Sequence, residues 1–116
     1  MTQIELYGIP NCDTVKKARS WLDEHGHTYH FHDYKKEGVD PLQLAGWARE
    51  VGWEALLNKR GTTFRKLDEA DKTDLDEAKA LGLMQAHPSL IKRPVAQTAQ
   101  GLLVGFTLSE WEDHLR

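Results

Sequence analysis

The single cysteine of the chain, Cys12, is the residue whose type and position most directly suggest chemistry. It follows a predicted strand and a Gly-Ile-Pro-Asn turn at 8–11, and a predicted helix begins there. A thiolate at a helix N-terminus interacts with unpaired backbone N–H groups and with the positive end of the helix dipole, and both lower its pKa. Lys16, one helical turn further along the same face, adds positive potential. The pattern predicts a nucleophilic cysteine; the alternative is a small, buried and unreactive apolar residue.

Two other kinds of cysteine site do not fit the neighbouring residues. A phosphatase loop requires an arginine after five intervening residues, but Ala18 stands there and Arg19 comes one position late. A C-x-x-C dithiol requires a second cysteine at the position of Val15. Because the chain has one cysteine, it cannot form an internal disulfide, and a resolving thiol must come from another molecule.

A group of histidines is the second feature that could carry chemistry. His30 and His32 are two residues apart on a predicted strand and therefore share one face, with His25 and His27 close by. This spacing would allow a metal site, but no cysteine or acidic residue completes an obvious ligand set. We therefore expect surface or packing histidines and no metal.

The elements that must position Cys12 alternate between strand and helix. Alternating polar and apolar residues predict a strand at 3–8, and an amphipathic helix follows Cys12 and ends at Gly26. Aromatic residues and threonine predict a second strand at 28–34. Strand, helix and strand form a βαβ unit, which favours a right-handed crossover and parallel pairing.

The middle of the chain is predicted to be helical. Asp40 followed by Pro41 predicts a capped helix that ends at Gly52. Asp74 with Glu77 predicts a second capped helix. These helices are separated by a short helix and a basic, threonine-containing loop.

The last third returns to strand, with predicted strands at 90–97 and 101–106. Ser109 with Glu112 predicts a capping box that opens a C-terminal helix. The expected fold class is therefore α/β, in a single domain over 1–116 with a helical insertion at about 40–87.

Composition narrows the function classes. The 116 residues suffice for one self-supporting core, and 40% hydrophobic and 28% charged residues are typical of an ordinary globular protein. A net charge of −3 and a pI near 6.0 argue against nucleic acid as the main partner. No signal peptide or membrane span is visible, so we expect a cytoplasmic protein whose thiol stays reduced. We also expect a monomer.

Three motifs carry a family resemblance: YGIPNCDTVKKA at 7–18, LLNKRGTTFRKL at 56–67 and HPSLIKRPV at 87–95. Together they resemble the arsenate reductase-related family of thioredoxin-like proteins, in particular its ArsC-like branch called YffB, which is grouped with the Spx regulators. The resemblance implies a thioredoxin-like sheet with an inserted helical block. It also implies that Cys12 is the redox nucleophile, that Arg93 lies beside it, and that the following proline is cis.

The chain departs from the arsenate reductases of this family, which use three arginines around the oxyanion. Arg93 matches one of them. Asn58 replaces the arginine that follows the Leu-Leu pair, with Arg60 two positions on, and the third, late arginine has no counterpart. Arsenate would lose much of its charge-assisted anchoring.

The expected function is therefore a glutathione-dependent monothiol reductase that works through a mixed disulfide on Cys12. Glutathione is the expected co-substrate, with no bound cofactor. The expected partners are a glutathionylated or disulfide-bearing substrate and a glutaredoxin-like protein. Cys12 and Arg93 are the predicted catalytic residues, and the predicted substrate-binding residues are Asn11, Lys16, Arg60, Arg65 and Pro94.

Two alternatives stay open at this point. One is a regulatory module that binds RNA polymerase, as the Spx regulators do. Gly52 matches a glycine that Spx-type proteins use in partner contact, although a glycine that ends a helix needs no partner to explain it. The chain also lacks the second cysteine of the Spx redox switch. The other alternative is an arsenate reductase.

Overall fold

The computed structural model describes residues 4–115, which fall into two compact units. Unit 1 contains the chain up to Glu37 and again from Arg93 onward, and unit 2 is Gly38–Lys92. The predicted strand at 3–8 and the predicted C-terminal helix each include one residue, Gln3 and Arg116, outside the described range. The description of the chain as a single domain with a helical insertion at about 40–87 stays a prediction.

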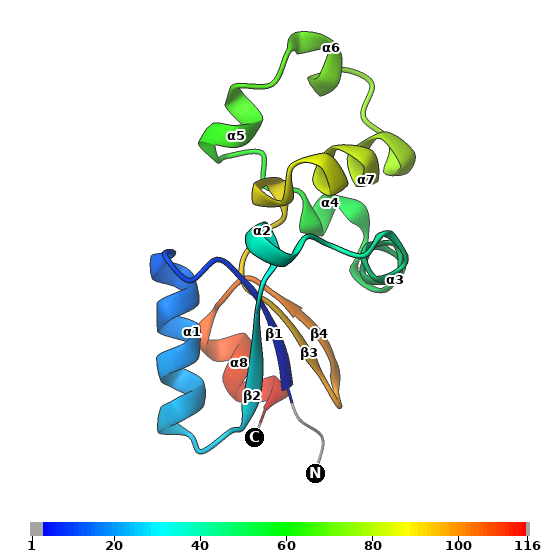
Figure 1. The fold of residues 1–116 in the computed structure, drawn as a ribbon. Helices are drawn as coiled ribbons and strands as arrows, with labels where there is room; N and C mark the ends of the chain where they lie inside the picture. The colour runs from blue at the N-terminus through cyan, green and yellow to red at the C-terminus, as the bar shows by residue number, and fades with distance from the viewer. Residues whose placement is uncertain (1–3, 116) are drawn as a thin grey trace. The chain divides into compact units, whose positions relative to one another are not determined.

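Unit 1 is built on a four-stranded sheet (Figure 1). Its strands are β1 (Ile4–Gly8), β2 (Tyr29–Asp33), β3 (Val95–Thr98) and β4 (Gly101–Val104), in the order β2-β1-β3-β4. β1 pairs with β2 in parallel, and the β1–β3 and β3–β4 pairs are antiparallel. The parallel pair predicted from the βαβ pattern is confirmed.

Two helices of unit 1, α1 (Asp13–Glu24) and α8 (Leu108–His114), pack against one face of this sheet. They form a single apolar core with alternate residues of the strands, as the period-2 pattern of a half-buried strand requires. Trp111 is fully buried and donates from Nε1 to the carbonyl of Gly105 at 3.0 Å. The buried members of this core are Ile4, Leu6, Ala18, Trp21, Leu22, Ala96, Leu103, Trp111 and Leu115.

The remaining element of unit 1 is α2 (Tyr34–Glu37), a single turn that directly follows β2. The Asp33 carboxylate accepts from the backbone N–H groups of Lys35 and Lys36, at 3.2 Å each. This local cap lets the chain turn into α2 as soon as the strand ends.

Unit 2 is helical and is built mostly from short elements. They are α3 (Pro41–Val51), α4 (Trp53–Leu56), α5 (Thr62–Arg65), α6 (Glu69–Lys72), α7 (Glu77–Ala86) and the 3-10 turn η1 (Pro88–Leu90). The Asp40 carboxylate caps α3 by accepting from the N–H of Leu42 at 3.0 Å, and Gly52 ends the helix with φ of 88°. Both ends of this helix are where the sequence predicted them.

Two predicted caps are wrong. Asp74 does not begin a helix, because it has a left-handed φ of 51°. The carboxylate of Asp76 caps α7 instead, accepting from Lys79 N–H at 2.8 Å. Several acidic residues stand close together in this segment, so a spacing rule alone selects the wrong one. Similarly, α8 begins at Leu108 without a side-chain cap, so Ser109 does not open a capping box.

Two loop and strand assignments also change. The predicted strand at 90–97 is shorter, because β3 begins at Val95, after Pro94. A proline has no N–H to offer a ladder, which explains this late start. The basic loop at 58–66 contains one helical turn, α5. Among the described helices, none is both long enough and apolar enough to cross a membrane.

Candidate active site

Cys12 is the N-cap residue of α1, as the sequence predicted. It has extended backbone angles, φ −132° and ψ 125°, and its carbonyl accepts the first helical hydrogen bond from Lys16 N–H at 2.9 Å. Gly8, at the end of β1, allows the helix to start this close to the sheet. A Cβ at Gly8 would lie 2.8 Å from Cγ2 of Val15, so any side chain there would require Val15 to shift.

The pairing of β1 with β2 and β3 brings three segments that are far apart in the sequence to the same edge of the sheet, the segments that contain Cys12, Tyr34 and Arg93. β1 and β2 run in parallel, so the residues that follow them, including Cys12 and Tyr34, leave from the same edge. β3 runs antiparallel to β1, with Tyr7 opposite Val95, so Arg93 approaches this edge from the other direction. Cys12, Tyr34 and Arg93 interact electrostatically with one another.

Opposing effects act on the pKa of the Cys12 thiol. Partial burial raises this pKa, but the backbone N–H of Val15, the Arg93 side chain and the N–H of Thr14 stabilise the thiolate more strongly. The pKa is therefore lowered overall.

Cys12 is a partly exposed residue, so a lowered thiol pKa and access for a reactant are combined in one side chain. These are the two properties that distinguish a reactive cysteine from a buried structural one.

Tyr34 is a member of this cluster that the sequence analysis did not single out. It is almost fully buried, with 1% of its surface exposed. Burial raises the pKa of its phenol far above the ordinary value, although the nearby Arg93 guanidinium opposes this by charge and by a hydrogen bond. The phenol therefore stays neutral and holds the guanidinium that faces Cys12. Its place directly after a strand parallel to β1 is the signal that could have identified it.

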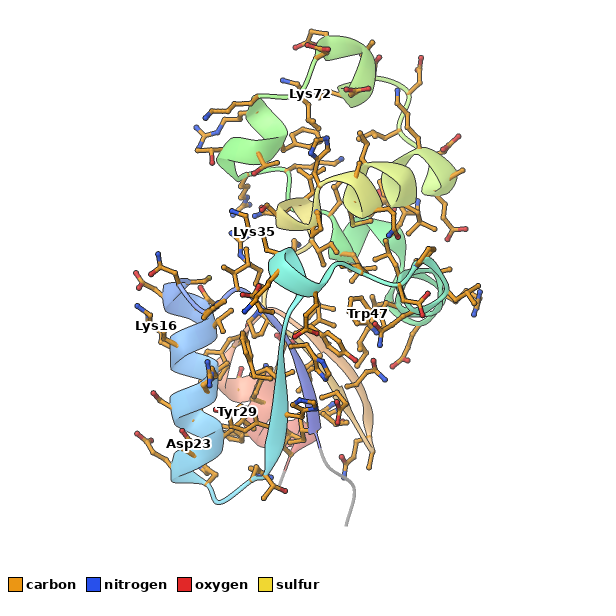
Figure 2. All side chains as sticks on the ribbon, in the orientation of Figure 1. Lys16, Asp23, Tyr29, Lys35, Trp47 and Lys72 are labelled. Atoms are coloured by element: carbon orange, nitrogen blue, oxygen red, sulfur yellow. The ribbon has the colours of Figure 1, made fainter. Side chains whose placement is uncertain are left out.

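Other predicted site residues of unit 1 have different surroundings. Pro94 is buried, and the Arg93–Pro94 peptide bond is cis, as the family resemblance implied. Asn11 is exposed in the turn before Cys12. The Lys16 side chain is exposed and points away from α1 into solvent (Figure 2). Roles for Asn11, Lys16 and Pro94 in substrate binding stay predictions.

Arg60 and Arg65 belong to unit 2, and both are exposed. The N–H of Arg60 donates to Oδ1 of Asn58 at 3.1 Å, which closes a local turn. Arg60 also lines a surface hollow of about 390 Å³ together with Lys59 and Lys92. This basic hollow suits an anion, and a role for Arg60 or Arg65 toward a glutathione carboxylate stays a prediction.

Comparisons with known proteins agree on one family. The ArsC family model matches residues 7–114. A solved structure of a protein called YFFB is 56% identical, with a TM-score of 0.94, over 98% of this chain and 100% of that one. An arsenate reductase (ArsC) related protein from Brucella melitensis is 50% identical, with a TM-score of 0.78, over 99% of this chain and 96% of that one. Among sequence relatives, the global transcriptional regulator Spx of Listeria innocua is 30% identical over 97% of this chain and 84% of its own length.

These matches span both units and include the three motifs and the cysteine-bearing turn. They confirm the thioredoxin-like α/β fold class and the resemblance read from the sequence. The chain belongs to the ArsC family of thiol-based reductases.

Proposed function

We propose that the chain is a glutathione-dependent monothiol reductase with Cys12 as its nucleophile. The observation that carries this proposal is the partly exposed Cys12 at the start of α1. Partial burial raises the pKa of its thiol, but backbone N–H groups and Arg93 stabilise the thiolate and lower this pKa overall. A cytoplasmic location, where glutathione is abundant and the thiol stays reduced, is part of the proposal.

The reaction has two balanced exchange steps. The Cys12 thiolate attacks the glutathione sulfur of a glutathionylated substrate, which forms a Cys12–glutathione disulfide and releases the substrate thiolate. A second glutathione thiolate then attacks the glutathione sulfur of this adduct, which releases oxidised glutathione and restores Cys12. No second cysteine exists in the chain to resolve the adduct, so an external thiol is required.

Arg93 and Tyr34 have different roles in this proposal. The guanidinium lowers the energy of the thiolate before attack and again when Cys12 leaves in the second step. Tyr34 holds Arg93 and does not react, since its phenol stays protonated. It is therefore a positioning residue.

The rate of alkylation of Cys12 by iodoacetamide, measured from pH 4 to pH 10, tests the proposal. Because only the thiolate reacts, the rate rises through the thiol pKa, and we expect the inflection below the ordinary value of about 8.5. The chain unfolded in urea is the control and should show the ordinary value. An inflection at or above that value in the folded chain would contradict an activated nucleophile.

A regulatory module is the second candidate, and the Spx relatives at 30% identity support it. A reduced, tagged chain would retain RNA polymerase in a pulldown if this function applied. The absence of polymerase under reducing conditions would remove this candidate. Arsenate reduction is less well supported, because Asn58 stands where the family's arsenate reductases carry an arginine.

A further inference from the structure

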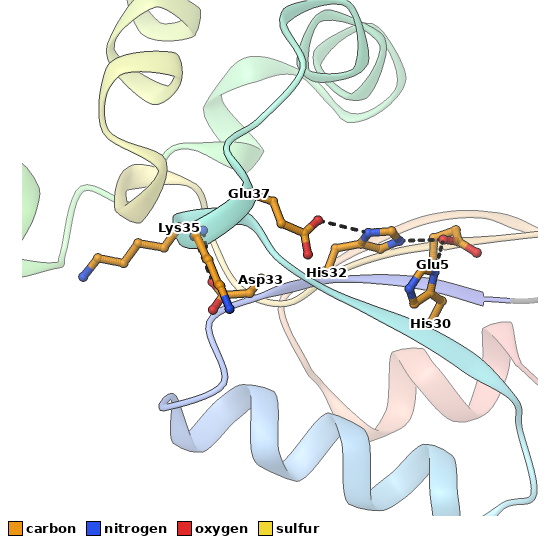
Figure 3. A network of polar contacts seen from close by, with 7 residues as sticks. Glu5, His30, His32, Asp33, Lys35 and Glu37 are labelled. Atoms are coloured by element: carbon orange, nitrogen blue, oxygen red, sulfur yellow. Dashed lines mark hydrogen bonds and ion pairs between the residues drawn. The ribbon is translucent and has the colours of Figure 1, made fainter.

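We propose that Glu5, His30 and His32 form a binding site for one divalent transition-metal ion on the sheet of unit 1, separate from the cysteine site. One nitrogen of each imidazole and one carboxylate oxygen of Glu5 lie within 4.8 Å of one another. The three side chains come together on neighbouring strands (Figure 3). This inference does not depend on the proposed reductase activity.

Strand pairing creates the cluster. Glu5 of β1 lies opposite His30 of β2, and His32 is two residues further along β2, on the same face. Along the sequence, no acidic residue obviously completes a ligand set with these histidines. The carboxylate comes instead from the neighbouring strand, which the order of residues along the chain does not show.

The surroundings of His32 favour a bound cation. Its Nε2 lies 2.6 Å from Oε1 of Glu5, and its Nδ1 lies 3.5 Å from Oε1 of Glu37 (Figure 3). A neutral imidazole has only one N–H, so it cannot donate to both carboxylates. In the neutral ring one nitrogen therefore presents a lone pair toward a carboxylate, an arrangement in which both groups can ligate one cation.

A metal ion bound by Nε2 of His32 and by the Glu5 carboxylate gives both ring nitrogens of His32 a partner. Nδ1–H is then directed at Glu37, and a carboxylate that accepts from the second ring nitrogen is the usual companion of a metal-bound histidine. The two carboxylates, Glu5 and Glu37, balance the charge of a divalent ion.

The ligand atoms lie near one another but must shift to hold one ion: Oε1 of Glu5 is 2.6 Å from Nε2 of His32 and 3.6 Å from Nδ1 of His30, and the three ligand atoms lie within 4.8 Å of one another. His32 stacks on the ring of Tyr7, with centroids 4.5 Å apart and planes 13° from parallel, which fixes its orientation. Ligand atoms on a tetrahedral zinc ion are about 3.3 Å apart, so the distance from Glu5 to His32 must open by about 0.7 Å. A rotation of the Glu5 side chain, which is 34% exposed, supplies this, and water completes the coordination.

The ligand types select the class of ion. Two imidazoles with one carboxylate suit zinc, copper, nickel and iron(II), whereas calcium and magnesium prefer oxygen ligands. The His30 side chain is 62% exposed, so an ion reaches the site directly from solvent.

The test is a calorimetric titration of zinc into the untagged Cys12→Ser chain, because a cysteine thiolate would bind zinc by itself. We expect one equivalent to bind. In nuclear magnetic resonance spectra, zinc should move the ring signals of His30 and His32 and leave the other four histidines unchanged. Those four are His25, His27, His87 and His114.

Variants in the same background assign the ligands. His30→Gln and Glu5→Gln should abolish saturable binding, and His30 is exposed enough that its replacement leaves the fold intact. Glu37→Gln should weaken binding by about 10–100-fold. His87→Gln, in unit 2 and outside the cluster, is the matched control and should bind as the parent does. Unchanged affinity in His30→Gln and Glu5→Gln, no zinc uptake at all, or equal uptake of magnesium would each overturn the proposal.

Discussion

The two units of the chain hold their charged side chains in different ways. In unit 1, Arg93 is partly buried and interacts with both Cys12 and Tyr34. In unit 2, the segment at 58–66 carries four basic residues, yet Arg60 and Arg65 are both exposed. The basic segment at 58–66 is therefore not the place where a positive charge interacts with the cysteine; that charge is Arg93, in unit 1.

The difference follows from the architecture of each unit. The sheet of unit 1 pairs strands from both ends of the chain, so residues far apart in sequence are fixed at one edge. The short helices α4, α5 and α6 of unit 2 have four residues each, and their charged side chains mainly contact residues nearby in the sequence. In α6, for example, Nζ of Lys72 lies 3.7 Å from Oε1 of Glu69, three residues earlier. Long-range pairing, more than local charge, gives a side chain a chemical role here.

Replacing the nucleophile should have the largest effect. Cys12→Ser should abolish glutathione-dependent reduction of a glutathionylated peptide, because no other cysteine can form the mixed disulfide. The activity is followed by the release of oxidised glutathione, and circular dichroism checks that the variant is folded. Residual activity above the rate without protein would show that the chemistry of unit 1 does not depend on Cys12.

Arg93→Ala should be the next largest change. A hydrogen bond to a charged group contributes about 1.5–3 kcal/mol, so thiol exchange at neutral pH should slow by about tenfold or more. The pKa of Cys12 should rise, because the guanidinium no longer stabilises the thiolate. Stopped-flow exchange with a disulfide reagent measures the rate. Arg93→Lys keeps the charge but loses the planar guanidinium, so its exchange rate should lie between those of the parent and of Arg93→Ala. If Arg93→Ala reacted as fast as the parent, Arg93 would have no role in the site.

In unit 2, the Asp76 carboxylate should contribute to the stability of the fold and not to reductase activity. Asp76→Ala should lower the free energy of unfolding by about 1 kcal/mol, because it removes the cap of α7. The matched control is Asp68→Ala, at the N-cap of α6, where no side-chain cap is present, and it should change stability little. Urea unfolding measures both. A larger loss in the Asp68 variant would contradict this assignment of the caps.

The smallest effect is expected from the exposed arginines. Arg60→Ala and Arg65→Ala should each raise the KM for glutathione by at most about fivefold, since an exposed ion pair contributes about 0.2–1 kcal/mol. The kcat should not change. An increase of tenfold or more in steady-state assays would mean that unit 2 supplies a strong anion contact, and the contrast drawn between the two units would fail.

The sequence predicted most of what depends on local pattern. The position of Cys12 at the start of a helix, the parallel pair of strands and the capped helix that begins at Pro41 were all read from spacing and turn residues. Motif resemblance, not spacing, pointed to Arg93. Where several acidic residues stood together, as between Asp74 and Glu77, the same local rules selected the wrong cap.

Contacts between distant segments were not predictable in this way. Tyr34 looked like the last residue of an aromatic strand, and its contact with Arg93 depends on the pairing of β1 with both β2 and β3. Glu5 looked like a polar residue on the solvated face of a strand. Only the register of β1 against β2 places it beside His30 and His32.

The solitary cysteine at the start of α1 has a kinetic consequence. In an enzyme with two thiols, the second thiol attacks the mixed disulfide within the same molecule, so the rate of this step does not depend on the concentration of external thiol. In the reaction proposed for Cys12, the adduct would persist until another thiol molecule collides with it, so its lifetime would be inversely proportional to the concentration of free thiol. As that concentration falls, the modified form accumulates, and the fraction of modified chains becomes a measure of the thiol supply.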